Sequence, residues 1–414
     1  MTVQELGAAA KAAGRVLALA GTEQKNRALE AIAAALTNHR EAWLAANEED
    51  LAAARAAGMR PSLLDRLTLT ETRVASAAAG VREVAALPDP IGRVDRMETR
   101  PNGLIIGRKS VPLGVIAIIF EARPNVAVDA AALCLKSGNA VILRGGKEAI
   151  HSNMAAVKLM REALKEAGLP EDCIALVEDT SRDSARALMH LSEYVDVLIP
   201  RGGAQLIRTV AREATVPVIR TGEGVCHVYI DREADLDMGA RILYNAKCSR
   251  PSVCNAAECV LIHEAVAGDF LKKALPLLEE KQVELRCDAV SLALLGERGI
   301  PASEEDWDAE YGDYILAVRV VKDMDEALGF IEAHGTGHSE AIVTKDYFAA
   351  QRFLNEVDAA AVYVNASTRF TDGGEFGLGA EIGISTQKLH ARGPMGLQEL
   401  TSVKYVVYGE GQVR

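Results

Sequence analysis

Residues 114–144 read GVIAIIFEARPNVAVDAAALCLKSGNAVILR, and this stretch decides the fold class. Residues 114–120 and 139–144 each form a short apolar run, which is typical of strands that are buried on both faces. Between them, residues 125–138 carry apolar side chains at helical spacing and end at Gly138, a residue type that often closes a helix. A strand, a helix and a second strand in this order predict a parallel sheet with a covering helix.

The alternation of strands and helices continues after this stretch. Further strands are expected at residues 173–178, 195–200 and 217–220. A second alternating series begins near Val225 and ends at about residue 364, whereas residues 1 to about 90 carry only helical patterns. We therefore predict an α/β protein with two doubly wound lobes. The expected domains are residues 1–224 with a tail of about 365–414, and residues 225–364.

Pro101, Asn102 and Gly103 lie between two extended stretches and predict a β-hairpin. The tail is rich in glycine, as in DGGEFGLGAEIGIST at residues 372–386. We interpret the hairpin and the tail as an oligomerisation arm. Because most soluble oligomers are symmetric, we expect a homodimer or a homotetramer.

The chain has 414 residues, of which 49% are hydrophobic, and a formal net charge of −12. This is a globular composition, and no apolar run is long enough to span a bilayer. The negative charge argues against non-specific nucleic-acid binding, and it means that an anionic substrate needs a local cationic pocket. The N-terminal residues lack the order of regions found in a signal peptide, so we expect a cytoplasmic protein with reduced thiols.

Three of the seven cysteines lie in residues 247–259, KCSRPSVCNAAEC. No metal is expected here, because zinc ligands usually come in closely spaced pairs and these cysteines are six and five residues apart. Cys259 lies in an apolar run, which favours a buried, unreactive thiol. Cys254 follows a proline-led turn, and the nearby Lys247 and Arg250 favour its nucleophilic thiolate form. The residues alone leave open whether Cys254 is catalytic or structural.

Four stretches together carry a resemblance to a known family. They are KCSRPSVCNAAEC at 247–259, FEARPNVAVDAAALCLKSGNAVILRGGKEAIHSN at 120–153, VLIPRGGAQLI at 197–207 and GPMGLQELTSVKY at 393–405. In these stretches the chain closely resembles the gamma-glutamyl phosphate reductase family, within the aldehyde dehydrogenase superfamily, and the resemblance covers essentially the whole chain. It implies an aldehyde dehydrogenase-like fold and the NADPH-dependent reduction of L-glutamyl 5-phosphate to L-glutamate 5-semialdehyde, with release of phosphate, in proline biosynthesis.

The resemblance also implies roles for two residues in the chemistry. Cys254 matches the nucleophile that forms a thioester with the substrate. Asn125 matches the asparagine that stabilises the oxyanion, although it is also a candidate cap of the helix that follows. The first domain then binds the dinucleotide, and the second carries the nucleophile.

Cofactor contacts are expected at the ends of two strands and in one loop. Arg144 and Lys147 are candidates for the adenosine ribose and a 2′-phosphate, which would favour NADPH over NADH. Gly202 and Gly203 would let the backbone approach the pyrophosphate at a helix start. Glu310 matches the glutamate that binds the nicotinamide ribose. The simpler alternatives are ordinary loops and, for Glu310, a solvated charge.

Cationic side chains are expected to bind the phosphate and carboxylate of this small-molecule substrate. The candidates are Arg123, Lys247, Arg250, Arg369 and His390. A glutamate kinase is a candidate protein partner, because it makes the labile substrate. No nucleic acid and no membrane are expected as partners.

Two rival functions remain. The first is a hydrolytic aldehyde dehydrogenase that oxidises a small aldehyde, which needs a glutamate to activate water. The matching position in this chain is Thr221, although Glu223 lies two residues away. The second is a non-catalytic or metal-binding protein of the same fold, against which Cys254 and Asn125 argue.

Overall fold

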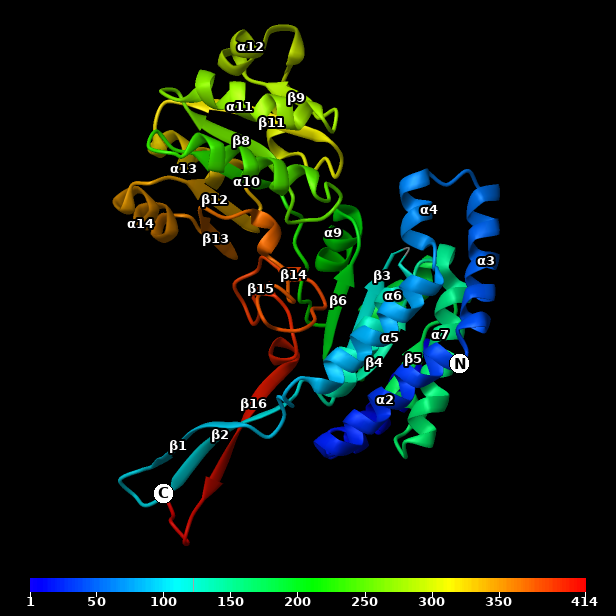
Figure 1. Ribbon diagram of the computed structural model, residues 1–414. Helices are drawn as coiled ribbons and strands as arrows, with labels where there is room; N and C mark the ends of the chain where they lie inside the picture. The colour runs from blue at the N-terminus through cyan, green and yellow to red at the C-terminus, as the bar shows by residue number, and fades with distance from the viewer. Residues whose placement is uncertain (122) are drawn as a thin grey trace. The chain divides into compact units, whose positions relative to one another are not determined.

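The computed structural model describes residues 1–121 and 123–414, and these divide into two compact units. The first unit comprises Met1–Thr221, Gly377–Gly383 and Met395–Arg414. The second comprises Gly222–Phe376 and Ile384–Pro394. Each unit is built around its own parallel sheet with helices packed on it (Figure 1), so the predicted α/β class is confirmed.

The first unit contains a four-stranded sheet in the order β5–β4–β3–β6, with every neighbouring pair parallel. Its strands are β3 (Val115–Phe120), β4 (Ala140–Arg144), β5 (Ile174–Leu176) and β6 (Val197–Arg201). The chain runs from β3 outward to β4 and β5, and then returns to the other side of β3 as β6. In parallel sheets such a switch point is where ligands bind, at the carboxyl ends of the strands.

The strand expected at residues 217–220 is wrong. Val218 makes only an isolated parallel bridge with Leu198 in β6. Pro217 has no N–H to donate, so this segment offers the sheet edge too few donors to form a continuous ladder.

Helices cover both faces of this sheet. The helices of the unit are α1 (Val3–Leu17), α2 (Thr22–Asn38), α3 (Arg40–Ala56), α4 (Pro61–Leu67), α5 (Glu71–Ala86), α6 (Pro124–Lys136), α7 (Ile150–Glu166), α8 (Arg182–Met189) and α9 (Ala204–Glu213). Side chains of α1 pack with alternate residues of β3 and β4 in one core. The intervening residues of β3 are equally buried, and α6 and α7 contact the strands as well. Burial on both faces explains why β3 is an unbroken apolar run.

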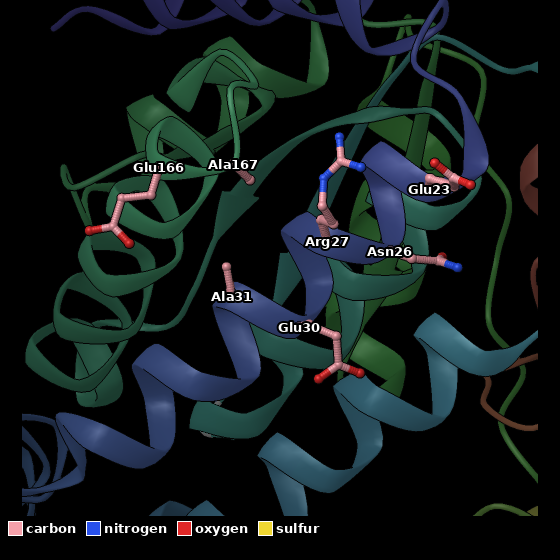
Figure 2. Close-up of a pocket in the computed structure, with 7 residues that line it drawn as sticks. All are labelled: Glu23, Asn26, Arg27, Glu30, Ala31, Glu166 and Ala167. Carbon is pink, nitrogen blue, oxygen red and sulfur yellow. The ribbon is translucent and has the colours of Figure 1, made fainter.

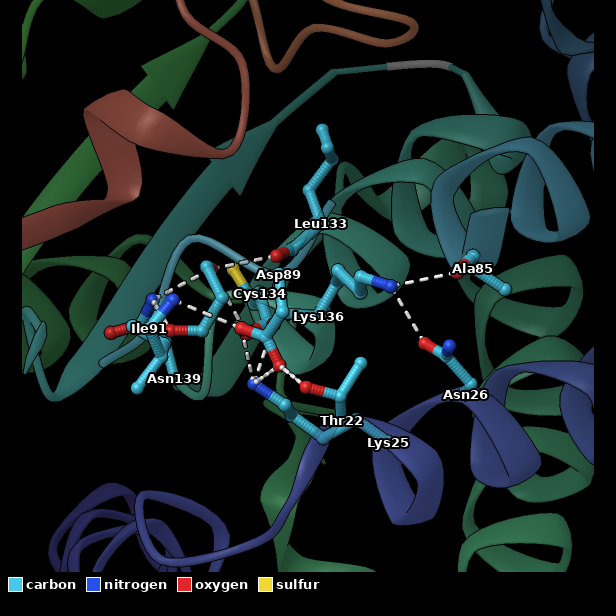
Figure 3. A network of polar contacts seen from close by, with 11 residues as sticks. Thr22, Lys25, Asn26, Ala85, Asp89, Ile91, Leu133, Cys134, Lys136 and Asn139 are labelled. Atoms are coloured by element: carbon cyan, nitrogen blue, oxygen red, sulfur yellow. Dashed lines mark hydrogen bonds and ion pairs between the residues drawn. The ribbon is translucent and has the colours of Figure 1, made fainter. Parts of the chain in front are cut away.

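Two buried lysines tie α2, α5 and α6 together (Figure 3). Lys25 is 1% exposed, and its Nζ lies 2.8 Å from Oδ1 of Asp89 and 3.0 Å from the carbonyl oxygen of Lys136. The Nζ of Lys136 donates to Oδ1 of Asn26 at 2.6 Å and to the carbonyl of Ala85 at 2.7 Å. Burial by itself raises the pKa of Asp89, but hydrogen bonds from Lys25, Ile91 and Thr22 outweigh it and lower the pKa below 3.8.

We expect Asp89→Ala to lower the free energy of unfolding by about 3 kcal/mol, because it leaves the Lys25 ammonium buried without its counter-ion. Since the pKa of Asp89 is lowered on folding, its contribution is present above about pH 4 and is lost as the pH falls through the lowered value. Urea titration at pH 7 measures the change. The exposed pair of Asp269 with Lys272 provides the control, and Asp269→Ala should cost less than about 0.5 kcal/mol. Equal losses for both variants would contradict this expectation.

The hairpin predicted around residues 101–103 is confirmed. Strands β1 (Val94–Thr99) and β2 (Ile105–Pro112) pair antiparallel, and Gly103 has a φ of +86° in the connecting turn. Strand β16 (Thr401–Tyr408) pairs along the other edge of β2 and completes a three-stranded sheet. Val403, Tyr405 and Val407 on β16 are exposed apolar side chains.

The second unit contains a seven-stranded sheet in the order β10–β9–β11–β8–β7–β12–β13. Its strands are β7 (Cys226–Ile230), β8 (Ala257–His263), β9 (Glu284–Cys287), β10 (Ile300–Pro301), β11 (Ile315–Val321), β12 (Ser339–Val343) and β13 (Ala361–Val364). Its helices are α10 (Leu236–Cys248), α11 (Ala267–Glu279), α12 (Ala289–Leu295), α13 (Met324–His334) and α14 (Tyr347–Glu356). Two separate apolar cores form, one with α10 and α11 and one with α13 and α14, so helices again cover both faces.

The tail, which we expected to join the first domain as a whole, divides between the two units. Residues 377–383 and 395–414 belong to the first unit, whereas residues 365–376 and 384–394 pack with the second. The short strands β14 (Ile384–Ser385) and β15 (Gly393–Pro394) pair with each other in the second unit. Among the helices of the described residues, none is both long and apolar enough to cross a bilayer.

Candidate active site

Cys254 lies in a turn between the end of α10 and the start of β8. All seven cysteines are free thiols, and Cys254 is the partly exposed one while the other six are buried. Burial raises the pKa of Cys134 and Cys259 above the usual range, and it raises the pKa of Cys248 to about 11. The neutral thiol is a poor nucleophile, so Cys254 is the cysteine suited to nucleophilic chemistry.

Hydrogen bonds fix the backbone on the C-terminal side of Cys254. The Asn255 side chain donates through Nδ2 to the carbonyl of Thr371 at 2.9 Å. The Thr368 hydroxyl donates to the carbonyl of Asn255 at 2.7 Å. The Cys226 thiol lies 3.2 Å from the carbonyl oxygen of Cys254 itself. These contacts hold the turn against the sheet and against the segment that follows β13.

Two arginines share the surroundings of Cys254. The half-buried Arg369 donates through Nε to the Ser249 hydroxyl at 3.2 Å, and its guanidinium also bonds to the side-chain oxygen of Asn255. Burial and the neighbouring Arg250 lower the pKa of Arg369, while Asp372 and Cys254 oppose this shift. Arg250 is exposed. The second unit therefore brings the expected residues Cys254, Arg250 and Arg369 into one region, where Arg369 interacts electrostatically with each of the other two.

Lys247 has a different environment from the one we expected. Its side chain is fully buried, and its Nζ lies 2.6 Å from Oε2 of Glu258. Burial raises the pKa of Glu258 to about 7, while Lys247 lowers it. The other carboxylate oxygen of Glu258 accepts from the Gly312 N–H at 3.3 Å. The charge of Lys247 is thus matched inside the fold, and we leave Lys247 out of the proposed anion site.

Two further expected residues of the second unit lie in exposed loops. Glu310 precedes β11, and it lies two residues before the Gly312 N–H that Glu258 holds. The buried pair of Lys247 and Glu258 therefore anchors the loop that carries Glu310. His390 is exposed between β14 and β15 and has a φ of +70°.

Asn125 belongs to the first unit and lies exposed in the first turn of α6, at the carboxyl end of β3. The N-cap of α6 is Arg123, so the alternative that Asn125 merely caps this helix is wrong. Its Nδ2 donates to Oδ2 of Asp129 at 3.0 Å, one turn further along the helix. Burial raises the pKa of Asp129 to about 6, while the Asn125 hydrogen bond and Arg201 lower it. One amide hydrogen of Asn125 is thus held by Asp129, and no hydrogen bond to the other is formed by the residues that the structure describes.

Gly202 and Gly203 lie between β6 and the start of α9, at the switch point of the first sheet. The Gly203 N–H donates to Oε2 of Glu121 at 2.8 Å, and a Cβ at Gly202 would lie 2.6 Å from the same oxygen. A carboxylate therefore occupies the helix start, which is a position suited to anions. This carboxylate already holds the Gly203 N–H, so a phosphate group bound here would take the place of its oxygen.

Arg144 and Lys147, the other two residues expected to bind the cofactor, differ in how far their side chains are already engaged in the fold. Arg144, at the end of β4, donates through its guanidinium to the carbonyls of Thr180 at 2.7 Å and Ser181 at 2.9 Å. Burial lowers the pKa of Arg144, while Glu148 and Asp179 raise it. Lys147 is exposed three residues later. Arg144 is thus largely committed to the loop that follows β5, whereas Lys147 faces solvent.

The chain is similar to proteins of a known family over its whole length. A model of the aldehyde dehydrogenase family matches residues 1–290. The gamma-glutamyl phosphate reductase of Carboxydothermus hydrogenoformans is 60% identical over 412 residues, which cover 100% of this chain and 99% of the relative. That of Enterococcus faecalis is 57% identical with the same coverage. The crystal structure of the enzyme of this name from Thermotoga maritima matches with a TM-score of 0.97 at 47% identity, and both chains are covered in full.

The chain belongs to the gamma-glutamyl phosphate reductases of the aldehyde dehydrogenase family. The family that the motifs indicated is therefore confirmed. The roles of individual residues stay predictions, and they are taken up below.

In this chain Thr221 occupies the position expected for a water-activating glutamate. It is buried, and its hydroxyl donates to the carbonyl of Pro200 at 2.8 Å. A hydroxyl engaged in this way is no general base at neutral pH. Glu223, the neighbouring carboxylate, is half-buried in the second unit.

A surface groove of about 750 Å³ lies over α2 and the end of α7 (Figure 2). Its lining includes the carboxylates of Glu23, Glu30 and Glu166 and one cation, Arg27. Because it is acidic and contains none of the expected site residues, it does not suit an anionic substrate. Among the described residues, no group of three or more His, Cys, Asp or Glu side chains is arranged to hold a metal ion.

The sequence did not reveal the residues that support the turn of Cys254. Asn255, Thr368 and Cys226 act through contacts that span from 28 to 116 positions of the chain. Gly224, two residues before β7, also lies against this turn, and a glycine next to a buried strand is a partial sequence signal of such a close backbone approach. The residue types of the others carry no comparable signal.

Proposed function

We propose that this chain catalyses the NADPH-dependent reduction of L-glutamyl 5-phosphate to L-glutamate 5-semialdehyde, with release of phosphate, in proline biosynthesis. The observation that carries the proposal is the partly exposed Cys254 thiol, held in an anchored turn beside Arg250 and Arg369. The name shared by relatives of up to 60% identity supplies the substrate.

The first chemical step uses the thiolate of Cys254. Its sulfur attacks the acyl carbon of the substrate, a carbon–sulfur bond forms, and the carbon–oxygen bond to phosphate breaks with its electron pair leaving on the phosphate. Arg250 and Arg369 bind the departing phosphate, since guanidinium groups match phosphate oxygens in pairs. Asn125, which matches the oxyanion-stabilising asparagine of the family, is the residue we assign to donate to the oxygen that becomes negative in the tetrahedral species.

The second step needs a hydride, and membership of the aldehyde dehydrogenase family supports a nicotinamide cofactor for it. NADPH supplies this hydride when it is bound. Gly202 and Gly203 would hold the pyrophosphate at the start of α9, Lys147 the 2′-phosphate, and Glu310 the nicotinamide ribose. The Cys254 sulfur leaves as a thiolate when the aldehyde forms, which returns the residue to its starting state.

The compartment, the oligomeric state and the binding partners of the protein are also part of the proposal. We infer a cytoplasmic homodimer or homotetramer. The free thiols agree with a reducing compartment, and the exposed apolar side chains of β16 suit contact with a second copy. Arg123 and His390 stay candidates for binding an anionic group of the substrate. A glutamate kinase stays the candidate protein partner.

Phosphate dependence of the reverse reaction tests this function. Purified protein is incubated with glutamate 5-semialdehyde and NADP⁺, with and without inorganic phosphate, and NADPH formation is followed at 340 nm. We expect NADPH to form only with phosphate, because phosphate must cleave the thioester. Equal rates without phosphate, with glutamate as product, would establish the hydrolytic rival instead.

A further inference from the structure

The segment that leads into β7 lies directly against the turn of Cys254, and both belong to the second unit. A Cβ atom on Gly224 would overlap the carbonyl oxygen of Cys254 and would lie 2.9 Å from its Cα. The φ angle of Gly224 is not in the left-handed region, so the requirement for glycine comes from this close approach alone. Any side chain at Gly224 would push the turn of Cys254 away from the sheet.

Cys226 contacts the same carbonyl from the first position of β7. Its Sγ lies 3.2 Å from the carbonyl oxygen of Cys254. Burial raises the pKa of the Cys226 thiol well above 9, and the carboxylate of Glu340 raises it further. The thiol therefore keeps its proton at neutral pH, and it can donate that proton to the carbonyl.

A buried chain of polar groups holds Cys226 in turn. Its sulfur lies 3.8 Å from Nδ1 of His338, which is 2.8 Å from the Ser339 hydroxyl. That hydroxyl is 2.6 Å from the Thr371 hydroxyl, which also contacts the Tyr363 hydroxyl at 2.7 Å. Burial lowers the pKa of His338 to about 4, so the ring is neutral and adds no charge beneath the nucleophile. These hydrogen bonds restrain the side chains they join, although Nε2 of His338 has no partner among the described residues.

The direction of the Cys254 side chain depends on these contacts. Holding the Cys254 carbonyl also holds the Cα bonded to it, which is the atom from which Cβ and Sγ extend, and so limits the directions open to the side chain. Thr368 holds the next carbonyl, that of Asn255, which leaves the turn little freedom on this side. We propose that Cys226 is a positioning residue: its thiol holds the Cys254 carbonyl against Gly224 and thereby directs the nucleophilic sulfur toward the acyl carbon. The consequence for turnover rests on the function proposed above.

The test compares Cys226→Ala with Cys226→Ser, because both side chains leave similar space and only serine keeps a donor. The matched control is Cys259→Ala, which removes a buried thiol from the neighbouring strand β8. Hydrogen exchange of the peptide containing residues 249–256 reports the anchoring without any substrate. Steady-state reduction of glutamyl phosphate reports the consequence, and iodoacetamide labelling of Cys254 across pH reports its ionisation.

We expect Cys226→Ala to speed exchange in this peptide several-fold and to lower kcat about tenfold, with KM changed less than about twofold. Cys226→Ser and Cys259→Ala should stay near the parent in both measurements. The pH dependence of Cys254 labelling should be unchanged in all three, because the proposed role is direction and not ionisation. If the alanine variant does not fold, Cys226→Val takes its place as a variant without a donor.

Several results would overturn the proposal. Equal turnover by Cys226→Ala and Cys226→Ser would show that the hydrogen-bond donor at this position is not needed. A loss of kcat in Cys259→Ala as large as that in Cys226→Ala would show that the effect is general destabilisation. A labelling profile that moves together with kcat would show that Cys226 acts through ionisation. If the parent protein does not reduce glutamyl phosphate, the proposed function fails, while the exchange measurement still decides whether Cys226 holds the turn.

Discussion

Replacing Cys254 by alanine is expected to lower kcat for glutamyl phosphate reduction by at least about 10⁴-fold, because no thioester can form without the sulfur. The KM for NADPH should change little, since Cys254 is not among the residues proposed to hold the dinucleotide. Stopped-time assays of phosphate release and NADPH consumption measure both quantities. Cys254→Ser keeps a weak nucleophile in place, and we expect it to retain only a trace of activity.

Cys248→Ala is the matched control for this prediction. Cys248 lies six residues before Cys254, is buried in the last turn of α10, and has its pKa raised to about 11 by burial. Its replacement should leave kcat within about twofold. Substantial turnover by Cys254→Ala, or an equal loss in Cys248→Ala, would show that the nucleophile has been assigned wrongly.

Arg369→Ala is expected to raise the KM for inorganic phosphate in the reverse reaction about 100-fold, because a half-buried guanidinium beside Cys254 is lost. The substitution also frees the Asn255 side chain from one of its partners. We therefore expect kcat to fall as well, by about tenfold. Arg369→Lys should recover only part of the loss, because an ammonium cannot form the paired contacts of a guanidinium.

Arg352→Ala controls for the loss of an arginine from the same unit. Arg352 is exposed on α14 and pairs with Asp325 and Glu356 on the surface. We expect its replacement to leave the KM for phosphate unchanged. An Arg369→Ala enzyme with normal phosphate saturation would move the phosphate site elsewhere and leave Arg250 and the loop of His390 as the candidates.

The parts of the fold that could be predicted are those set by local pattern. The strand, helix and strand within residues 114–144 can be predicted from local pattern. A strand buried on both faces is a continuous apolar run, and a helix places apolar residues at every third or fourth position. The failure at residues 217–220 has a local cause that could have been weighed, since Pro217 removes a donor. The division of the tail depends on contacts such as that of Asn255 with Thr371, which join distant positions and leave no trace in the pattern.

In the candidate site, too, the contacts between distant positions could not be predicted from the sequence. The sequence marked Cys254 by the proline-led turn before it, and in the structure Cys254 is the partly exposed cysteine. Lys247 was expected beside the substrate because it is close in sequence, yet the end of α10 turns it toward Glu258 on β8. Proximity along the chain does not reveal which side of a helix faces the interior. The Cys226 contact was missed because it joins two segments that only the sheet brings together.

The pairing of β16 with β2 has a consequence for how the protein is made. During synthesis β2 emerges early and can pair with β1 along one edge. The strand that covers its other edge, β16, is translated near the end of the sequence. Throughout that interval β2 presents uncovered N–H and C=O groups, which invite pairing with other nascent chains. A fragment of residues 1–221 would keep this exposure permanently, so we expect it to aggregate when expressed alone.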